Sequence, residues 1–156
     1  MTITRASTAD AECVLQLQKL AYRSEALLYG DFSIPPLTQT LDDLRAEFAT
    51  KTVLKALLND QIVGSVRASH KHGTCFIERL IVHPDFQGQG IGTQLLLDVE
   101  ACFPNADRLE LFTGHRSHRN IRLYERLGYR IFRQQPVSSS LSLVYIEKLK
   151  QAPPDA

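Results

Sequence analysis

Three glycines at alternate positions constrain this chain more than any other feature. Gly88, Gly90 and Gly92 lie between a strand-like run at residues 76–83 and an apolar-periodic run at residues 93–103. This order predicts a strand, a tight turn and a helix that begins on the turn. The bare backbone brings unpaired N–H groups and the positive end of the helix dipole to one point. We therefore expect an anion site of the kind that binds the phosphates of a nucleotide-like cofactor.

Two common phosphate-binding patterns do not fit this turn. A P-loop ends in Gly-Lys-Ser/Thr, and the chain has no lysine between Lys71 and Lys148. The dinucleotide fingerprint needs glycines spaced G-x-G-x-x-G, but Thr93 takes the last position when Gly88 is the first. That fingerprint also comes early in a chain of alternating strands and helices, whereas this turn follows a run of strands. The turn therefore predicts an anion site of another kind.

Length and charge narrow the class of protein. The chain has 156 residues, which is one domain's worth, and we expect a single domain over residues 1–150. Residues 151–156 contain two prolines, and we expect them to form a disordered tail. Hydrophobic residues make up 44% and charged residues 22%, which is ordinary for a soluble globular protein. The net charge of +1 gives no general reason to expect nucleic acid or an anionic membrane as a partner.

The cysteines and the N-terminus predict a cytoplasmic protein without a metal. Cys13, Cys75 and Cys102 have neither CxxC nor His-adjacent spacing, so we expect reduced, partly buried thiols. The histidines have no ligand spacing that would suggest a metal. Acidic residues Asp10 and Glu12 and the lack of a long apolar core argue against a signal peptide. No apolar run approaches the ~20 residues that a membrane span needs.

The first half of the chain predicts two helices and an antiparallel meander. Strand-like residues 3–6 precede a helical stripe at residues 10–28, and a second helix follows at residues 40–50. Residues 29–36 break the helix with two prolines, and they form either a connecting loop or a wall of the substrate site. Short turns then separate the three strand-like runs, which are residues 53–58, 62–69 and 74–83.

The second half predicts a mixed sheet. A helix at residues 91–103 leads to a strand at residues 108–113, and this crossover predicts that the two flanking strands lie parallel. A helix at residues 118–127 ends at Gly128, and strands at residues 129–135 and 142–149 close the chain. We therefore predict an α/β fold of the α+β type. Its central sheet is mixed and mostly antiparallel, with about six to seven strands flanked by helices.

Two motifs in this chain resemble the GNAT family of N-acetyltransferases. Residues 87–92 read QGQGIG and are similar to the family signature Gln/Arg-x-x-Gly-x-Gly/Ala, after a strand ending in LIVHP. Residues 120–129 read NIRLYERLGY and resemble the family's later Leu-Tyr-Glu-x-x-Gly-Phe/Tyr helix. The spacing of the motifs and the order of strands and helices fit the family over essentially the whole chain. The resemblance implies the acyl-CoA N-acyltransferase fold and acetyl-CoA as the acetyl donor.

The resemblance also assigns roles to individual residues. It implies that the backbone of the turn holds the pyrophosphate of acetyl-CoA, namely at Gln87, Gly88, Gln89, Gly90, Ile91 and Gly92. It implies that the backbone of the preceding strand pairs with the pantetheine amides, namely at Leu80, Ile81 and Val82. Tyr124 matches the tyrosine beside the thioester sulfur, where it protonates the leaving thiolate or orients the sulfur. Many relatives carry an asparagine at the position of Ser117, and Asn120 lies about one helical turn beyond it, within reach of the cofactor.

The basic residues near Asn120 have two interpretations. Arg116, Arg119 or Arg122 could pair with the cofactor's phosphates, or they form an exposed cluster at the start of the helix. Tyr22 and Tyr29, like other aromatic residues of the N-terminal region, either line a substrate pocket or belong to the core.

An amine must lose a proton before it attacks a thioester, so the site needs a proton acceptor. Glu78 is the candidate, because strict alternation places it on one strand face with Phe76, Leu80 and Val82. Burial among apolar residues would strengthen its affinity for a proton. The alternative is an ion pair with a neighbouring arginine or a solvated strand edge. His83 falls on the other face, where a structural role beside Pro84 is favoured.

The predicted function is transfer of acetyl from acetyl-CoA to a primary amine of a small molecule or protein. None of the three cysteines lies in either motif, so we expect direct attack in a ternary complex rather than a cysteine-bound intermediate. The alternatives are a non-catalytic acyl-CoA-binding module and a transferase of a longer acyl group. The acceptor amine stays unidentified, and since relatives are often dimers, a homodimer is one of the oligomeric states to consider.

Overall fold

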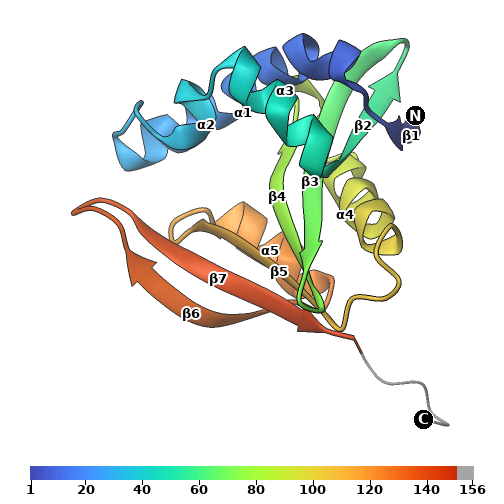
Figure 1. The fold of residues 1–156 in the computed structure, drawn as a ribbon. Helices are drawn as coiled ribbons and strands as arrows, with labels where there is room; N and C mark the ends of the chain where they lie inside the picture. The colour runs from blue at the N-terminus through green and yellow to red at the C-terminus, as the bar shows by residue number, and fades with distance from the viewer. Residues whose placement is uncertain (151–156) are drawn as a thin grey trace, which may run out of the picture.

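A seven-stranded mixed sheet with helices on both faces forms the centre of this computed structural model, which describes residues 1–150 (Figure 1). The strands are β1 (Thr2–Arg5), β2 (Thr52–Leu58), β3 (Gln61–Lys71), β4 (Thr74–Val82), β5 (Arg108–Gly114), β6 (Arg130–Pro136) and β7 (Ser142–Leu149). Their order across the sheet is β1-β2-β3-β4-β5-β7-β6. This confirms the predicted fold class. The tail expected at residues 151–156 lies outside the described residues.

The helices are α1 (Ala11–Tyr29), α2 (Pro35–Thr38), α3 (Leu41–Thr50), α4 (Ile91–Ala101) and α5 (His118–Arg126), with single 3-10 turns at η1 (Thr8–Asp10) and η2 (Pro84–Phe86). Thr40 caps α3, because its hydroxyl accepts a hydrogen bond from the Asp43 N–H at 3.2 Å. The loop predicted at residues 29–36 is interrupted by α2, since proline is well tolerated in the first helical turn. α4 ends earlier than predicted, and Cys102 beyond it is exposed rather than buried.

β4 and β5 are parallel, as the crossover predicted, but they pair over only three residues. Thr74, Cys75 and Phe76 face residues 108–110, and beyond this point the two strands separate (Figure 1). Every other strand pair in the sheet is antiparallel. The second half of β4 therefore has hydrogen-bonded pairing only on its β3 side, and its other edge opens into the interior of the molecule.

β4 also contains a bulge that strict alternation did not predict. Arg67 of β3 faces Glu78, whereas Ser65 faces Ile81, so β4 has one more residue than β3 between these pairs. Arg79 takes up the irregularity with φ at 54°, a conformation that few residues other than glycine adopt. The bulge moves Leu80 to the face that carries the main core. The prediction that Glu78 shares a face with Leu80 and Val82 is therefore wrong.

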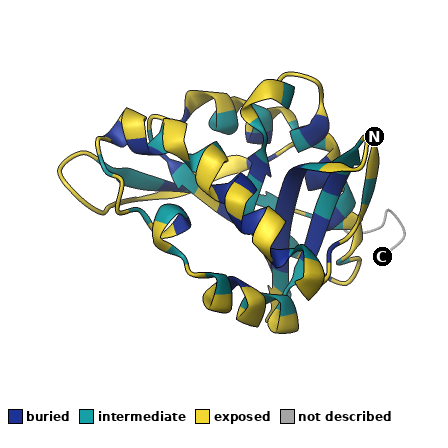
Figure 2. Cartoon of the chain, turned by 90° about the horizontal axis from the view of Figure 1, so that it is seen from above, coloured by how far each residue is buried: buried dark blue, intermediate teal, exposed yellow. Residues whose placement is uncertain are grey.

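The core lies in two layers on opposite sides of the sheet (Figure 2). The larger cluster packs α4 and α5 on the sheet around Leu95, Leu96 and Val99, which are fully buried. The smaller cluster lies under α1 and α3 around Val14 and Leu44. Figure 2 shows exposed residues along the outer sides of the helices and buried ones toward the sheet, as amphipathic helices require.

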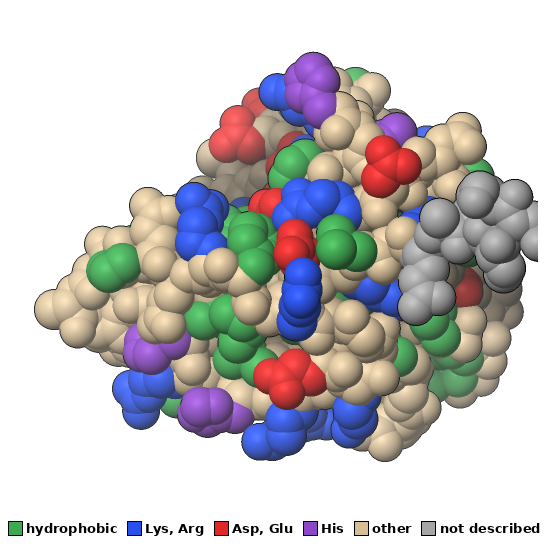
Figure 3. All heavy atoms as spheres, turned by 90° about the horizontal axis from the view of Figure 1, so that it is seen from below, with side chains coloured by type: hydrophobic (Ala, Val, Ile, Leu, Met, Phe, Trp, Pro, Cys, Tyr) green, Lys and Arg blue, Asp and Glu red, His purple; other side chains and the backbone are tan. Residues whose placement is uncertain are grey.

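In the described part of the chain, no helix covers the outer face of β5, β7 and β6 (Figure 1), and charged and hydrophobic side chains lie on the surface seen from that side (Figure 3). Positive and negative side chains alternate there beside exposed rings. The Arg108 guanidinium donates to Glu147 at 2.7 Å and lies 5.3 Å from the centre of the Phe132 ring. Within residues 1–150, no helix combines the length and apolar composition that a membrane crossing requires.

Candidate active site

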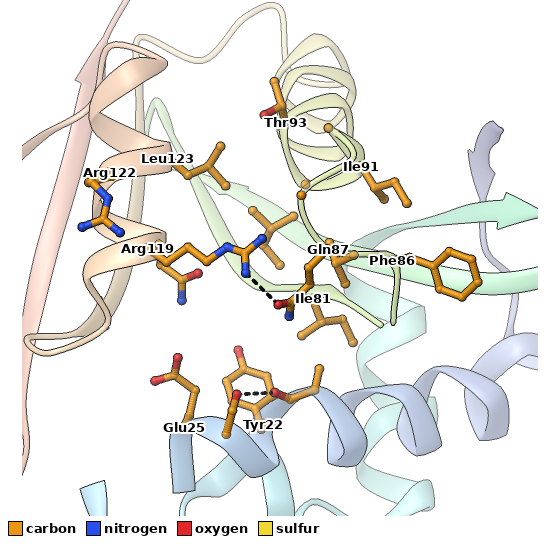
Figure 4. Close-up of a pocket in the computed structure, with 18 of the residues that line it drawn as sticks. Tyr22, Glu25, Ile81, Phe86, Gln87, Ile91, Thr93, Arg119, Arg122 and Leu123 are labelled. Carbon is orange, nitrogen blue, oxygen red and sulfur yellow. Dashed lines mark hydrogen bonds between the residues drawn. The ribbon is translucent and has the colours of Figure 1, made fainter. Parts of the chain in front are cut away.

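The separation of β4 from β5 leaves a cavity of about 510 Å³ between β4, the glycine-rich turn, α1 and α5 (Figure 4). Leu80, Ile81 and Val82 line it from β4. Val82 and Ile81 pair with Gly64 and Ser65 on the β3 side, while the other edge of β4 has no partner strand there. This edge offers free backbone donors and acceptors to an extended ligand, which is the arrangement that β-strand addition uses.

The glycine-rich turn forms the second wall of this first cavity. Gly88 and Gly90 have φ of 78° and 85°, so both positions favour glycine. Gly90 is the N-cap of α4 and supplies no side-chain cap. The first N–H groups of the helix are therefore available to an anion in the cavity, together with the positive end of the helix dipole. Gly92 has an ordinary φ, and a Cβ there would meet Leu123 and Val82 at 3.6 Å.

The turn residues predicted to hold the cofactor do not all face the cavity. Those that line it are Gln87, Gly88, Gly90, Ile91 and Gly92. Gln89 is exposed and does not line it. The role predicted for the Gln89 backbone stays a prediction.

Basic side chains of α5 form the third wall. Arg119, Arg122 and Arg126 line the cavity, and the Arg119 guanidinium donates to the Gln87 side-chain oxygen at 3.0 Å across its mouth (Figure 4). Arg116 points elsewhere and donates to the Leu28 carbonyl at 3.2 Å. Of the two interpretations of these basic residues, the phosphate-facing one suits Arg119 and Arg122, but not Arg116.

A second cavity of about 300 Å³ adjoins the first. The two share four lining residues, which are Tyr22, Glu25, Leu80 and Asn120. Most of its remaining lining is apolar and comes from α1, α2, β4, β5 and the β6–β7 hairpin. The proline-containing segment at residues 34–36 is part of this lining, and its role as a wall of the substrate site stays a prediction. Phe32 is exposed and Phe48 packs in the smaller core cluster, so neither contributes.

Tyr124 lines the second cavity from α5 and is 6% exposed. Desolvation by this burial raises the pKa of the Tyr124 phenol, and the charge of Glu25 raises it further. The hydroxyl therefore keeps its proton at neutral pH, which suits a proton donor. Asn120, one helical turn earlier, donates to the Thr113 hydroxyl at 3.5 Å and lines both cavities.

Glu78 lines the second cavity but also belongs to a cluster of charges. It pairs with Lys51, whose ammonium also donates to Glu47 at 2.7 Å. Glu47 in turn forms an ion pair with the Arg67 guanidinium, whose Nε lies 3.2 Å from the carboxylate. Arg67 is buried, with 1% of its side chain exposed. Of the alternatives for Glu78, an ion pair is the observed one, although its partner is Lys51 rather than an arginine.

Glu25 is the functional candidate that the sequence did not indicate. It lines both cavities from α1, and Figure 4 shows it beside Tyr22 facing α5. Ser117 donates to its carboxylate at 2.6 Å, and the Ser117 hydroxyl lies 2.8 Å from that of Tyr29. Ser117 and Tyr29 are both buried, so this chain of contacts fixes the end of α1 against β5 and α5.

His83 caps the turn that follows β4. The Nδ1 of His83 accepts a hydrogen bond from the Asp85 N–H at 3.0 Å and so caps η2, which is a structural role. Within residues 1–150, no group of three or more potential ligands is arranged to hold a metal ion.

The chain was compared with models of known protein families. The model of the acetyltransferase (GNAT) family matches residues 15–129. The chain belongs to the acetyltransferase (GNAT) family. Membership confirms the predicted family and, at the level of the family, the predicted class of enzyme, which transfers acyl groups from CoA thioesters (EC 2.3.1 type).

Solved structures with the same fold include one with coenzyme A bound and one with acetyl-CoA bound. PaiA N-acetyltransferase from Thermoplasma acidophilum in complex with coenzyme A is 16% identical, with a TM-score of 0.79 over 96% of this chain and 100% of that one. YncA from Salmonella typhimurium with acetyl-CoA is 23% identical, with a TM-score of 0.76 over 100% and 98%. The ribosomal-protein-S18-alanine N-acetyltransferase from Escherichia coli is 16% identical, with a TM-score of 0.79 over 99% and 97%.

Among curated proteins, the chain is 28% identical to UPF0157 protein YqkA of Bacillus subtilis (strain 168) over 116 residues. The match covers 74% of this chain and 33% of that protein, so the chain spans about a third of the length of this curated relative.

Proposed function

We propose that this chain transfers an acetyl group from acetyl-CoA to a primary amine by direct attack in a ternary complex. One observation carries the proposal. The unpaired edge of β4 and the uncapped start of α4 line a single cavity, and this cavity adjoins the one that contains Tyr124. A ligand with an anionic, an extended and a reactive part would meet a complementary surface at each of these three places.

Acetyl-CoA has these three parts. The N–H groups at the start of α4 would hold its pyrophosphate, and Arg119 and Arg122 would add charge-assisted hydrogen bonds. The free edge of β4 at Leu80, Ile81 and Val82 would pair with the pantetheine amides. Asn120, which faces both cavities, would orient the thioester end of the ligand.

The reaction in this arrangement is a single acyl transfer. The amine nitrogen bonds to the thioester carbonyl carbon, the carbon–sulfur bond breaks, and the products are the N-acetyl amine and CoA. Tyr124 would supply a proton to the departing thiolate, because its phenol, whose pKa is raised further by burial, is protonated at neutral pH. The amine must lose a proton to a group that lines the second cavity.

The proton acceptor is the part of the proposal that the geometry modifies. Glu78, the candidate from the sequence, is held by the cationic Lys51. Glu25 faces both cavities, and no cation lies within 4 Å of its carboxylate among residues 1–150. We therefore assign proton acceptance to Glu25, directly or through water, and keep Glu78 as the second candidate, to be separated by variants.

A screen of amines with acetyl-CoA tests the proposal. The purified chain is mixed with acetyl-CoA and a panel of small amines and peptides, and thiol release and the mass of the product are measured. Turnover of at least one amine, with a lower rate in Tyr124→Phe, is the expected result. Cofactor binding without turnover of any amine, and without an effect of Tyr124→Phe, would support the non-catalytic acyl-CoA-binding module instead.

Three further features belong to the proposal. Rates with acetyl-CoA and butyryl-CoA would separate an acetyltransferase from a transferase of longer acyl groups.

A cytoplasmic location is supported by the three free thiols, Cys13, Cys75 and Cys102, since reducing compartments favour unpaired cysteines. A homodimer, without nucleic acid or membrane as a partner, is the assembly we propose to test by sedimentation.

A further inference from the structure

The second cavity contains a cation without a counterion. Its lining includes three charged side chains, Glu25, Glu78 and Arg79, among residues that are mostly apolar. Charges in such surroundings are costly unless each one meets a partner.

Four neighbouring charges neutralise one another. Lys51 lies between Glu47 and Glu78, and Glu47 also contacts the Arg67 Nε at 3.2 Å. The remaining donors of Arg67 are directed to Gln18 at 3.0 Å and to Gln39 at 3.3 Å. This cluster contains two carboxylates and two cations, so it leaves no negative charge for Arg79.

Arg79 has no such partner. Its Nε is buried and makes no hydrogen bond, and no carboxylate within residues 1–150 lies within 4 Å of its guanidinium. The guanidinium carbon lies 6.0 Å from the centre of the Tyr22 ring, which also lines the cavity. The β4 bulge holds Arg79 with φ at 54°, so the chain adopts an uncommon backbone conformation at the residue that brings this charge to the cavity.

Glu25 is the complementary group on the α1 side of the same cavity. Its carboxylate accepts from Ser117 at 2.6 Å and has no cationic partner in the described chain. Both Glu25 and Arg79 influence the Tyr22 phenol. Desolvation raises the pKa of Tyr22, the positive charge of Arg79 and its hydrogen bond to the phenol oppose this, and the negative charge of Glu25 adds to it. One unpaired anion and one unpaired cation therefore lie around a single tyrosine.

We propose that the acceptor is a small zwitterionic amine, an α-amino acid with an apolar side chain, whose carboxylate binds Arg79. This inference rests on the proposed acetyl transfer and names its substrate class. A guanidinium binds a carboxylate through two parallel hydrogen bonds, and the ammonium of the same molecule faces Glu25. The apolar side chain packs against Ile34, Pro36 and Leu111. A volume of about 300 Å³ is at the small end of ligand pockets, which suits such an acceptor.

The chemistry follows from this placement. Glu25 takes the proton that the ammonium loses, the freed nitrogen bonds to the thioester carbonyl carbon, and the carbon–sulfur bond breaks. The thiolate takes its proton from Tyr124. The second proton of the attacking nitrogen returns to the Tyr124 phenolate as the amide forms, and the product is an N-acetyl amino acid. Polyamines and the amines of proteins lack a carboxylate beside the reacting nitrogen, so they leave Arg79 unpaired.

Matched acceptors test the inference. Rates with acetyl-CoA are measured for L-leucine, leucinamide and isopentylamine, for L-phenylalanine, phenylalaninamide and phenethylamine, and for spermidine and a peptide with a free N-terminus. We expect the amino acid to exceed its amide and its amine in kcat/KM by at least about tenfold in each set. In Arg79→Gln this preference should fall toward one, and Arg79→Lys should retain part of it. Arg45→Gln, an exposed arginine on α3, is the control and should keep the preference.

The outcomes separate this inference from the proposed function. Acetylation of spermidine, the peptide or the uncharged amines in preference to the amino acids would overturn the substrate class and leave the acetyl transfer standing. An unchanged preference in folded Arg79→Gln that still binds acetyl-CoA would also overturn it. Binding of acetyl-CoA without turnover of any amine in the panel would overturn both.

Discussion

The substitution Gly114→Ala tests whether the contacts of Tyr29 and Ser117, which support Glu25, stabilise the second cavity. Gly114 ends β5 directly against Tyr29, and a Cβ there would lie 2.0 Å from the Tyr29 hydroxyl and 2.4 Å from its ring carbon Cζ. Real Cβ atoms do not approach so closely, so Tyr29 must move. The Tyr29 hydroxyl meets Ser117 at 2.8 Å and accepts from the Arg116 N–H at 2.9 Å, and the move breaks both contacts.

The loss can be estimated from these contacts. Overpacking of this kind costs about 1 to 3 kcal/mol. Each of the two hydrogen bonds adds roughly 1 kcal/mol. We therefore expect the free energy of unfolding to fall by about 3 to 5 kcal/mol. For a domain of this size the melting temperature then drops by roughly 6 to 20 °C. The rate of acetyl transfer should fall as well, because Ser117 loses the partner that helps it to orient Glu25.

Differential scanning calorimetry measures the effect, and Gly92→Ala is the matched control. At Gly92 a Cβ would make ordinary contacts at 3.6 Å and φ is not positive, so the melting temperature should stay within about 4 °C of wild type. If Gly114→Ala melts as close to wild type as Gly92→Ala does, the Tyr29 contact does not support the site and the reasoning is wrong.

Three further predictions concern the charges of the site. Glu25→Gln should lower kcat by about 100-fold or more, and Glu78→Gln by much less, as measured by thiol release; the reverse order would return proton acceptance to Glu78. Arg119→Ala should weaken acetyl-CoA binding in calorimetric titration by about tenfold, with KM for the amine unchanged. Burial alone would raise the pKa of Glu47, but hydrogen bonds from Lys51 and Gln39 and the charge of Arg67 hold it below its usual 4.5. The interactions of ionised Glu47 therefore stabilise the folded state fully above pH 4.5. This stabilisation is lost as the pH falls through the lower pKa that Glu47 has in the folded protein. Lys51→Met should therefore reduce the melting temperature more at pH 7 than at pH 3, and an equal reduction would contradict it.

The sequence predicted the fold because its signals are local. Apolar periodicity and the prolines and glycines between elements located the helices and strands to within a few residues. The crossover through α4 predicted the parallel pair β4–β5. The glycine-rich turn indicated an anion site before any family was considered, and positive φ at Gly88 and Gly90 gives its physical reason.

The site was predicted less completely because its remaining parts are not local. The bulge at Arg79 changes the face of every later residue in β4. Its position cannot be predicted from the sequence, because no glycine or asparagine occupies the residue with positive φ. The contact between Glu25 and Ser117 joins residues 92 positions apart, and that between Lys51 and Glu78 joins residues 27 positions apart. Helix and strand periodicity contains no information about which of these groups meet.

The central claim is that the glycine-rich turn binds the donor, and calorimetric titration of acetyl-CoA tests it most directly. Gly90→Val puts a branched side chain at φ 85° on the cap of α4. Gly30→Val is its matched control, since Gly30 has φ 65°, no neighbour within 4 Å and no place in the lining of either cavity. The account predicts that wild type and Gly30→Val bind acetyl-CoA, and that folded Gly90→Val does not. Binding of acetyl-CoA by Gly90→Val with the affinity of wild type would contradict it.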